Sequence, residues 1–122
     1  MTKVLRVTRH PAQADQLEAL EQAFGEVAVE QVSETLPDDD RDEAVERFDE
    51  LAEEADVVEA VLPIQLLQAV LEDSDFSDRG GTLIRAKMER VVSDDGDADF
   101  VFDHYEVVEE VSISTRPLNN SR

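Results

Sequence analysis

The sequence predicts a small α/β domain with a three-layer sheet of the Rossmann-like or flavodoxin-like kind. Two segments rich in β-branched and apolar residues, 2–9 and 56–62, are each followed by a proline and then by apolar residues at helical spacing. A third observation is the pair of β-rich runs near the C-terminus, which a short loop with Asp-Gly joins into a hairpin. The order β-α-β-α-β-α-β-β predicts strands in the order 2-1-3-4-5, with helices on both faces and a C-terminal antiparallel hairpin.

The first third of the chain predicts a strand, a helix and a second strand. Segment 2–9 predicts a strand covered on both faces, in which Arg6 must pair with an acid or lean toward an open edge. Pro11 is expected to begin a helix that ends at Gly25. Segment 26–32 alternates, and we expect an edge strand there. The expected buried side of the helix carries Ala14, Leu17, Leu20, Ala23 and Phe24.

The second helix is expected to begin after Asp40, which forms a capping pair with Glu43. Its apolar stripe runs toward Ala55, and the opposite side is acidic. The most apolar part of the chain, 56–70, follows, and we place it at the centre of the fold. Residues 57–62 predict a buried strand, and Pro63 stands where a helix begins. The buried positions of that helix are predicted to be Ile64, Leu67, Val70 and Leu71, and a loop through Phe76 follows.

The hairpin register follows from placing Val92 opposite Ala98. This choice puts three apolar residues of the first strand on one face with Phe100, Phe102 and His104. A slip by one residue would put the phenylalanines beside charged residues, so burial favours the first register. The other face then sets Lys87 opposite Asp103 and Arg85 opposite Tyr105. We expect an extended segment over 107–115, a bulge at 109–110, one domain over 1–118 and a frayed tail over 119–122.

The composition combines 11 basic and 31 acidic side chains, which gives a net charge of −20, with no cysteine. The absence of cysteine excludes disulfides and thiol chemistry. So much like charge opposes compaction in ordinary buffer, whereas in molar salt the Debye length falls to about 3 Å. This composition resembles that of proteins from salt-in halophiles such as haloarchaea or their viruses. The alternative is an acidic protein of a mesophile, or one with a disordered acidic tail.

The charge and the hydropathy also narrow the partners and the compartment. Nucleic-acid binding rests on counterion release, and this surface has the wrong sign for it. No apolar run approaches the roughly 20 residues that cross a bilayer, and the N-terminus lacks the apolar core of an export signal. We therefore expect a cytoplasmic protein with neither a membrane nor a nucleic-acid partner.

Candidate site residues follow from the rule that ligands bind beyond the carboxyl ends of the strands, where the strand order reverses. That rule nominates Thr8, Arg9 and His10 after the first strand and Gln65 at the start of the third helix. Arg9 and His10 beside two helix N-termini would favour an anion. Arg90 also lies near that edge if the fourth strand is parallel. The alternative is that Arg9 pairs with an acid and His10 is a turn residue.

His104 is a further candidate, for proton transfer, although a histidine on an apolar face is more often structural. The acids over 94–99 and at Asp73, Asp75 and Asp78 do not match a Ca²⁺ loop. Dinucleotide, P-loop and nucleophile-elbow fingerprints are missing from the sequence. We therefore expect no cofactor and no metal.

Two hypotheses of function remain. The first is a non-catalytic Rossmann-like module that binds a protein partner or a small anionic ligand at the carboxyl edge of the sheet. The second is a small enzyme that uses His10 or His104 as a general acid or base. A homodimer through the terminal hairpin and its extension is also expected, because Val107, Val108, Val111 and Ile113 are more apolar than a solvated edge favours.

Overall fold

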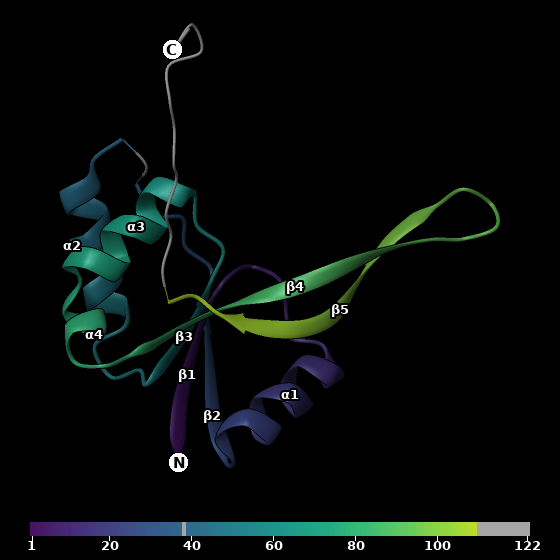
Figure 1. Ribbon diagram of the computed structural model, residues 1–122, viewed down its shortest axis with the longest axis horizontal. Coiled ribbons are helices and arrows are strands. Elements are labelled where there is room, and N and C mark those ends of the chain that lie inside the picture. The colour runs from purple at the N-terminus through teal and green to yellow at the C-terminus, as the bar shows by residue number, and fades with distance from the viewer. Residues whose placement is uncertain (38, 110–122) are drawn as a thin grey trace, which may run out of the picture.

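The computed structural model describes residues 1–37 and 39–109 (Figure 1). Strands and helices alternate along the chain until the final hairpin. In order they are β1 (Thr2–Val7), α1 (Ala14–Phe24), β2 (Val27–Val32), α2 (Arg41–Leu51), β3 (Val57–Ala60), α3 (Ile64–Asp73), α4 (Asp75–Asp78), β4 (Thr82–Val92) and β5 (Ala98–Val107).

The five strands form one mixed sheet in the order β2-β1-β3-β4-β5, as the sequence predicts. Strands β1 to β4 run parallel to one another, and β5 returns antiparallel to β4. Strand β2 is an edge, as expected from its alternation. Helices α2, α3 and α4 cover one face and α1 lies on the other, which makes the sheet doubly wound (Figure 1).

Two apolar cores lie on the two faces of the sheet. The larger core joins β1, β3 and β4 to α2, α3 and α4, with Phe48 and Phe76 in edge-to-face contact at 5.5 Å between ring centroids. The smaller core lies under α1 and includes Val4, Leu20 and Ile84. Alternate residues of each central strand therefore enter different cores, which explains why the strands are apolar on both sides.

The predicted central strand is confirmed over Val57–Ala60, where all four side chains are buried. The sequence predicts that the strand continues to residue 62, but it ends at Ala60, and Val61 is 81% exposed. The chain leaves the sheet at that point, and Pro63 caps α3 as predicted. This short strand is paired on both sides, by β1 and β4.

Helix α1 begins three residues later than Pro11, and it buries only part of the predicted side. Gln13 caps it, and the backbone N–H of Gln13 donates to Oε1 of Gln16 at 2.8 Å. Leu20 is buried and Phe24 packs against the smaller core as predicted, but Leu17 is exposed and Gln16 is buried beside Leu20 instead. The physical reason is that the Gln16 amide satisfies its polar atoms inside, so the helix can turn this residue toward the sheet.

The remaining helices confirm one prediction and correct two. The Asp40 side chain accepts from the backbone N–H of Glu43 at 3.1 Å, so the predicted cap is present. Ile64 is exposed, because α3 turns Leu66 and Ala69 inward beside the predicted Leu67 and Val70. The segment expected to be a loop through Phe76 contains helix α4. Phe76 itself is buried, because its ring packs against that of Phe48.

The hairpin register is correct near its tip and wrong near its base. Val92 lies opposite Ala98 as predicted, but the pairing shifts between Lys87 and Met88 and skips Asp103. Beyond this bulge Lys87 lies opposite His104, and Arg85 lies opposite Glu106. Tyr105 therefore takes the inward place that the sequence pattern assigned to His104.

The bulge expected at 109–110 involves Glu110, which is outside the described residues, so it stays a prediction. The predicted extension beyond residue 109, with Val111 and Ile113, the end of the domain at residue 118 and the tail 119–122 also lie outside them. Among the helices that the structure describes, none has the length and apolar character needed to cross a membrane.

Candidate functional site

A crevice of about 510 Å³ lies at the carboxyl ends of β1, β2 and β3. The chain leaves β1 toward β2 on one side, and β3 lies on the other, so this is the point where the strand order reverses. The residues around the crevice come from the loops that follow these three strands and from the start of α3. They are Val7, Thr8, Arg9, His10, Ser33, Glu34, Thr35, Leu36, Val61, Leu62, Pro63 and Leu66.

The loop after β1 is held in place by two hydrogen bonds. The backbone N–H of His10 donates to Oγ1 of Thr8 at 3.2 Å, which turns the chain away from the strand. Below it, Nη1 of Arg6 donates to the carbonyl oxygen of His10 at 2.9 Å. The side chains of Arg9 and His10 are exposed beside the crevice. No carboxylate among the described residues lies within ion-pair distance of Arg9.

The N-terminus of α3 borders the same crevice and has no side-chain cap. Pro63 occupies the cap position, but its side chain cannot accept a hydrogen bond from the first N–H groups of the helix, and the first turn of α3 contains no acid. In contrast, α1 is capped by Gln13 and Gln16, and α2 by Asp40. The free amide groups of a helix start carry a partial positive charge. These amide groups and Arg9 border the same crevice, and both favour an anion.

Glu34 is the acid that lines the crevice, and Arg47 of α2 offsets its charge. Nε and Nη2 of Arg47 donate to the two carboxylate oxygens at 2.5 and 2.7 Å. These hydrogen bonds lower the pKa of Glu34 and raise the pKa of Arg47 from their ordinary values. Glu34 is thus fixed as one half of an ion pair, which reduces the repulsion that an anion in the crevice would meet.

The structure brings three of the six predicted site residues together and places three elsewhere. Thr8, Arg9 and His10 line the crevice. Gln65 is exposed on the first turn of α3 and is not among the lining residues. Arg90 is on the hairpin opposite Phe100, because β4 runs on beyond the end of β3. His104 is exposed there, with Nδ1 2.6 Å from Oδ2 of Asp103.

A buried polar network lies behind the crevice on the α1 face of the sheet, and sequence reasoning found only part of it. Arg6 and Glu59 are register neighbours in β1 and β3, and Nε and Nη2 of Arg6 donate to the carboxylate of Glu59 at 2.9 and 3.3 Å. Nη1 of Arg6 also donates to Oε1 of Gln31 at 3.0 Å. The expectation that Arg6 pairs with an acid is therefore confirmed.

Tyr105 closes this network from β5. Its hydroxyl donates to Oε1 of Glu59 at 2.6 Å and accepts from Nε2 of Gln16 at 3.4 Å. Burial, followed by the hydrogen bond to Glu59, raises the pKa of the Tyr105 phenol above its ordinary value. Burial opposes the charge on Arg6, but its hydrogen bond and attraction to Glu59 outweigh burial and raise the pKa of the guanidinium.

The sequence carried a signal for this network. Arg6 and Glu59 carry opposite charges among the apolar residues of two strands, and the predicted strand order makes those strands neighbours. All buried side-chain polar atoms of the described residues have a hydrogen-bond partner, so the network is complete as it stands. The residues that line the crevice do not include Arg6, Glu59 or Tyr105. We therefore assign these three residues to support of the crevice loop, not to contact with a ligand.

The crevice offers hydroxyl groups, an imidazole and an arginine side chain. Hydroxyl groups of Thr8, Ser33 and Thr35, the guanidinium of Arg9 and the start of α3 are suited to the oxygens of an anion. Within residues 1–37 and 39–109, no three side chains of the metal-binding kinds gather closely enough to hold an ion.

The fold and the crevice together define a doubly wound α/β domain with a polar cleft at its switch point. Comparison with protein family models, with curated proteins and with solved structures finds no match for this chain.

Proposed function

We propose that this protein is a non-catalytic binding module that holds a small anionic ligand in the crevice at the carboxyl ends of β1, β2 and β3. The observation that carries the proposal is Arg9, which is exposed at the crevice and has no ion-pair partner among the described residues of a chain with 31 acids. In such a chain an arginine that is kept from carboxylates is available for a ligand. The uncapped start of α3 adds backbone N–H donors, which also favour an anion.

Calorimetry with inorganic phosphate and with nucleoside monophosphates, in about 1 M KCl, tests this proposal. We expect saturable binding that Arg9→Ala weakens roughly tenfold or more, because a charge-assisted hydrogen bond contributes about 1.5–3 kcal/mol. Arg90→Ala removes an equally exposed arginine far from the crevice and serves as the matched control. Heat that does not saturate, or an equal loss in both variants, would contradict the proposal.

A small enzyme is the second candidate, and the position of His10 at the crevice favours it. An imidazole there could act as a general acid or base on a bound ester. Phosphorus NMR of a panel of phosphate esters would follow turnover by the wild type and by His10→Ala and His104→Ala. Turnover that His10→Ala abolishes supports catalysis, and turnover unchanged in both variants removes both histidines as catalytic residues.

We also propose a homodimer through the β4–β5 hairpin, which the exposed apolar residues of that hairpin support. We also propose a cytoplasm with molar salt as the working environment. The net charge of −20 on 122 residues supports that setting, because such a surface repels itself less when the Debye length is short.

A further inference from the structure

The outer part of the β4–β5 hairpin has no cover from the rest of the described chain. β3 pairs with β4 only over Thr82–Ile84, so the hairpin beyond that point is a two-stranded arm, which we define as residues 85–105. The arm reaches away from the body of the molecule (Figure 1). Every residue over 89–101 is exposed. An isolated two-stranded ribbon is only marginally stable in water unless a further strand or a helix packs against it. The exposed part of this arm has no such cover from the described residues.

The base of the arm is fixed to the body. Phe102 is buried, and its ring lies 4.9 Å from that of Tyr105. The Tyr105 hydroxyl is hydrogen-bonded to Glu59 and Gln16, so the base of the arm is anchored to the body of the molecule. The exposed outer part is therefore presented in a set direction.

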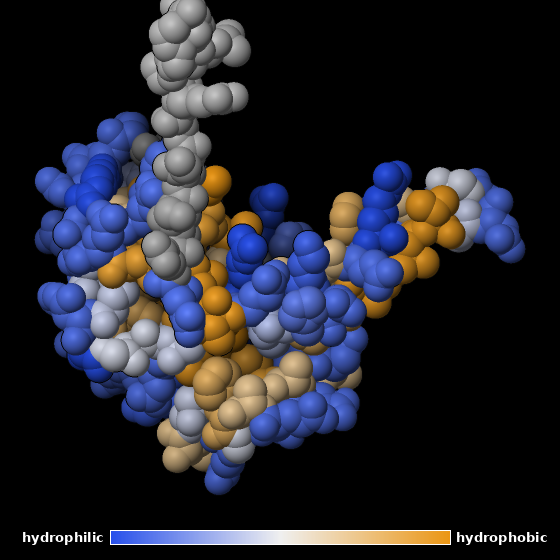
Figure 2. Space-filling view, in the orientation of Figure 1, coloured by the Kyte–Doolittle hydropathy of each residue, from blue (hydrophilic) through white to orange (hydrophobic). Residues whose placement is uncertain are grey.

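Apolar side chains are exposed on both faces of the arm. Phe100 is 65% exposed and Val92 is 58% exposed on the face that continues the α1 side of the sheet. Val91 and Val101 are exposed on the opposite face. Figure 2 shows apolar residues among charged ones on the side of the arm that faces the viewer. A solvated ribbon favours polar side chains at free positions, so this pattern indicates a surface that is covered in use.

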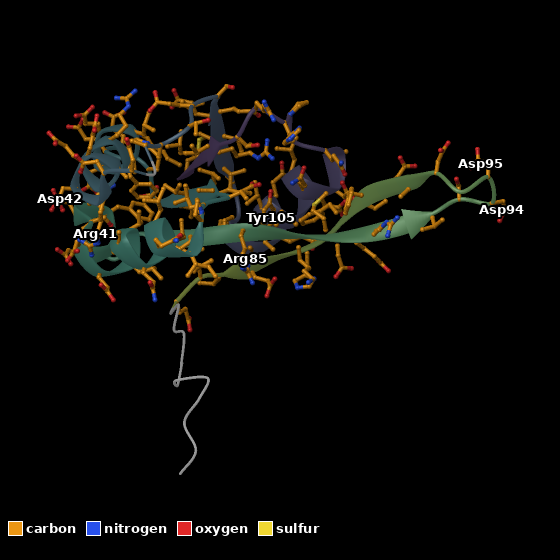
Figure 3. The ribbon with its side chains drawn as sticks, turned by 90° about the horizontal axis from the view of Figure 1, so that it is seen from above. Arg41, Asp42, Arg85, Asp94, Asp95 and Tyr105 are labelled. Atoms are coloured by element: carbon orange, nitrogen blue, oxygen red, sulfur yellow. The ribbon has the colours of Figure 1, made fainter. Side chains whose placement is uncertain are left out.

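The charge of the arm changes along its length. Its tip carries only acids, at Asp94, Asp95, Asp97 and Asp99, whereas its base carries the cations Arg85, Lys87 and Arg90 together with the acids Glu89 and Asp103, and so is net positive. Figure 3 shows Asp94 and Asp95 at the tip and Arg85 near the body. Within the described part of the chain, neither Lys87 nor Arg90 forms an ion pair, and Arg85 has one contact of 3.7 Å with Glu106.

We propose that the arm pairs antiparallel with the arm of a second copy of this chain, with the acidic tip of each arm against the cationic base of the other. This inference deepens the proposed homodimer and rests on it. A two-fold axis across the arms brings apolar middle against apolar middle and opposite charges together at both ends. A parallel arrangement would bring the two acidic tips together. A basic partner would suit the acidic tip but would meet the unpaired Lys87 and Arg90 at the base, whereas a second copy offers each region of the arm its complement.

Sedimentation equilibrium of the full chain in about 1 M KCl tests the self-association. We expect a dimer whose dissociation constant rises about tenfold or more in Lys87→Glu and in Val92→Ser, in line with losses of about 1.4 kcal/mol or more. The double variant Lys87→Glu with Asp95→Lys restores opposite charges and should recover most of the affinity. Lys3→Glu, at the only other lysine, and Val61→Ser, at an exposed valine outside the arm, are the matched controls.

Cross-linking tests the direction of the arms, and it is clean because the chain has no cysteine. Cysteines at positions 87 and 95 of one arm are separated by roughly 17 Å or more of strand, too far for an internal disulfide. We expect the variant with Lys87→Cys and Asp95→Cys to form a covalent dimer on oxidation, and Asp95→Cys alone to form none. Dimers linked through Asp95→Cys alone would overturn the antiparallel arrangement and leave the homodimer standing. A monomer at every concentration would overturn both.

Discussion

Nη1 of Arg6 lies 2.9 Å from the carbonyl oxygen of His10, and this bond joins the buried centre of the sheet to the crevice. The same guanidinium is held on its other side by Glu59. The loop that carries Arg9 is therefore positioned by a charge pair that does not itself reach the crevice. Stability and ligand binding can be separated by variants of this pair.

Glu59→Ala is expected to lower the free energy of unfolding by about 3–5 kcal/mol, because it leaves the Arg6 charge buried without its partner. The double variant Arg6→Met with Glu59→Leu should recover most of that loss, since it removes both charges. Urea unfolding in molar KCl measures both effects. The double variant should still bind phosphate more weakly than the wild type, because the His10 carbonyl has lost its donor. A loss below about 1 kcal/mol in Glu59→Ala would contradict the buried pair.

Tyr105 is expected to resist ionisation in the folded protein. Because its pKa is raised on folding, its contribution to stability is complete below the ordinary tyrosine pKa of about 10 and is lost as pH rises from there toward the higher folded value. It is the only tyrosine, so tyrosinate absorbance reports on this group alone. Tyr105→Phe should remove its share of the alkaline loss of stability. Native absorbance that titrates near pH 10 would show an exposed phenol instead.

Gly81 has no room for a side chain. A Cβ there would lie 2.4 Å from the nearest atom of the Phe76 ring, which is fully buried. Gly81→Ala should therefore cost about 1–3 kcal/mol of unfolding free energy. The cost should shrink in a Phe76→Leu background, where the ring is gone. Additive losses in this double-mutant cycle would mean that the two residues do not touch.

Salt is expected to stabilise the fold strongly. Raising KCl from about 0.1 M to about 2 M shortens the Debye length from about 10 Å to below about 3 Å and weakens repulsion among the 31 acids. The thermal midpoint, followed by circular dichroism, should rise across this range. An unchanged or falling midpoint would count against the proposed high-salt environment.

The sequence predicted the architecture because its strongest signals are local. A buried strand followed by a helix that starts at Pro63, an alternating edge strand and a short turn each restrict the topology, and the switch-point rule then located Thr8, Arg9 and His10. The burial of Gln16 was not predictable in this way. It depends on Tyr105, which is 89 residues away in the chain.

The bulge at Asp103 was missed for a related reason. Alternation fits the register on either side of it, and the turn fixes the pairing only near the tip. Tyr105 takes the inward position because its hydroxyl forms a hydrogen bond with Glu59 on β3, and the sequence of the hairpin alone does not reveal this partner. Arg90 and His104 were separated from the crevice by the length of the arm, which exceeds that of the neighbouring strand.

Amide NMR shifts during a titration with inorganic phosphate in molar KCl test the central claim most directly, because they locate the ligand. We predict saturable shifts over residues 8–10 and at the start of α3, with the arm over residues 89–101 unaffected. Shifts confined to the arm, or none that saturate, would contradict a binding site at the crevice.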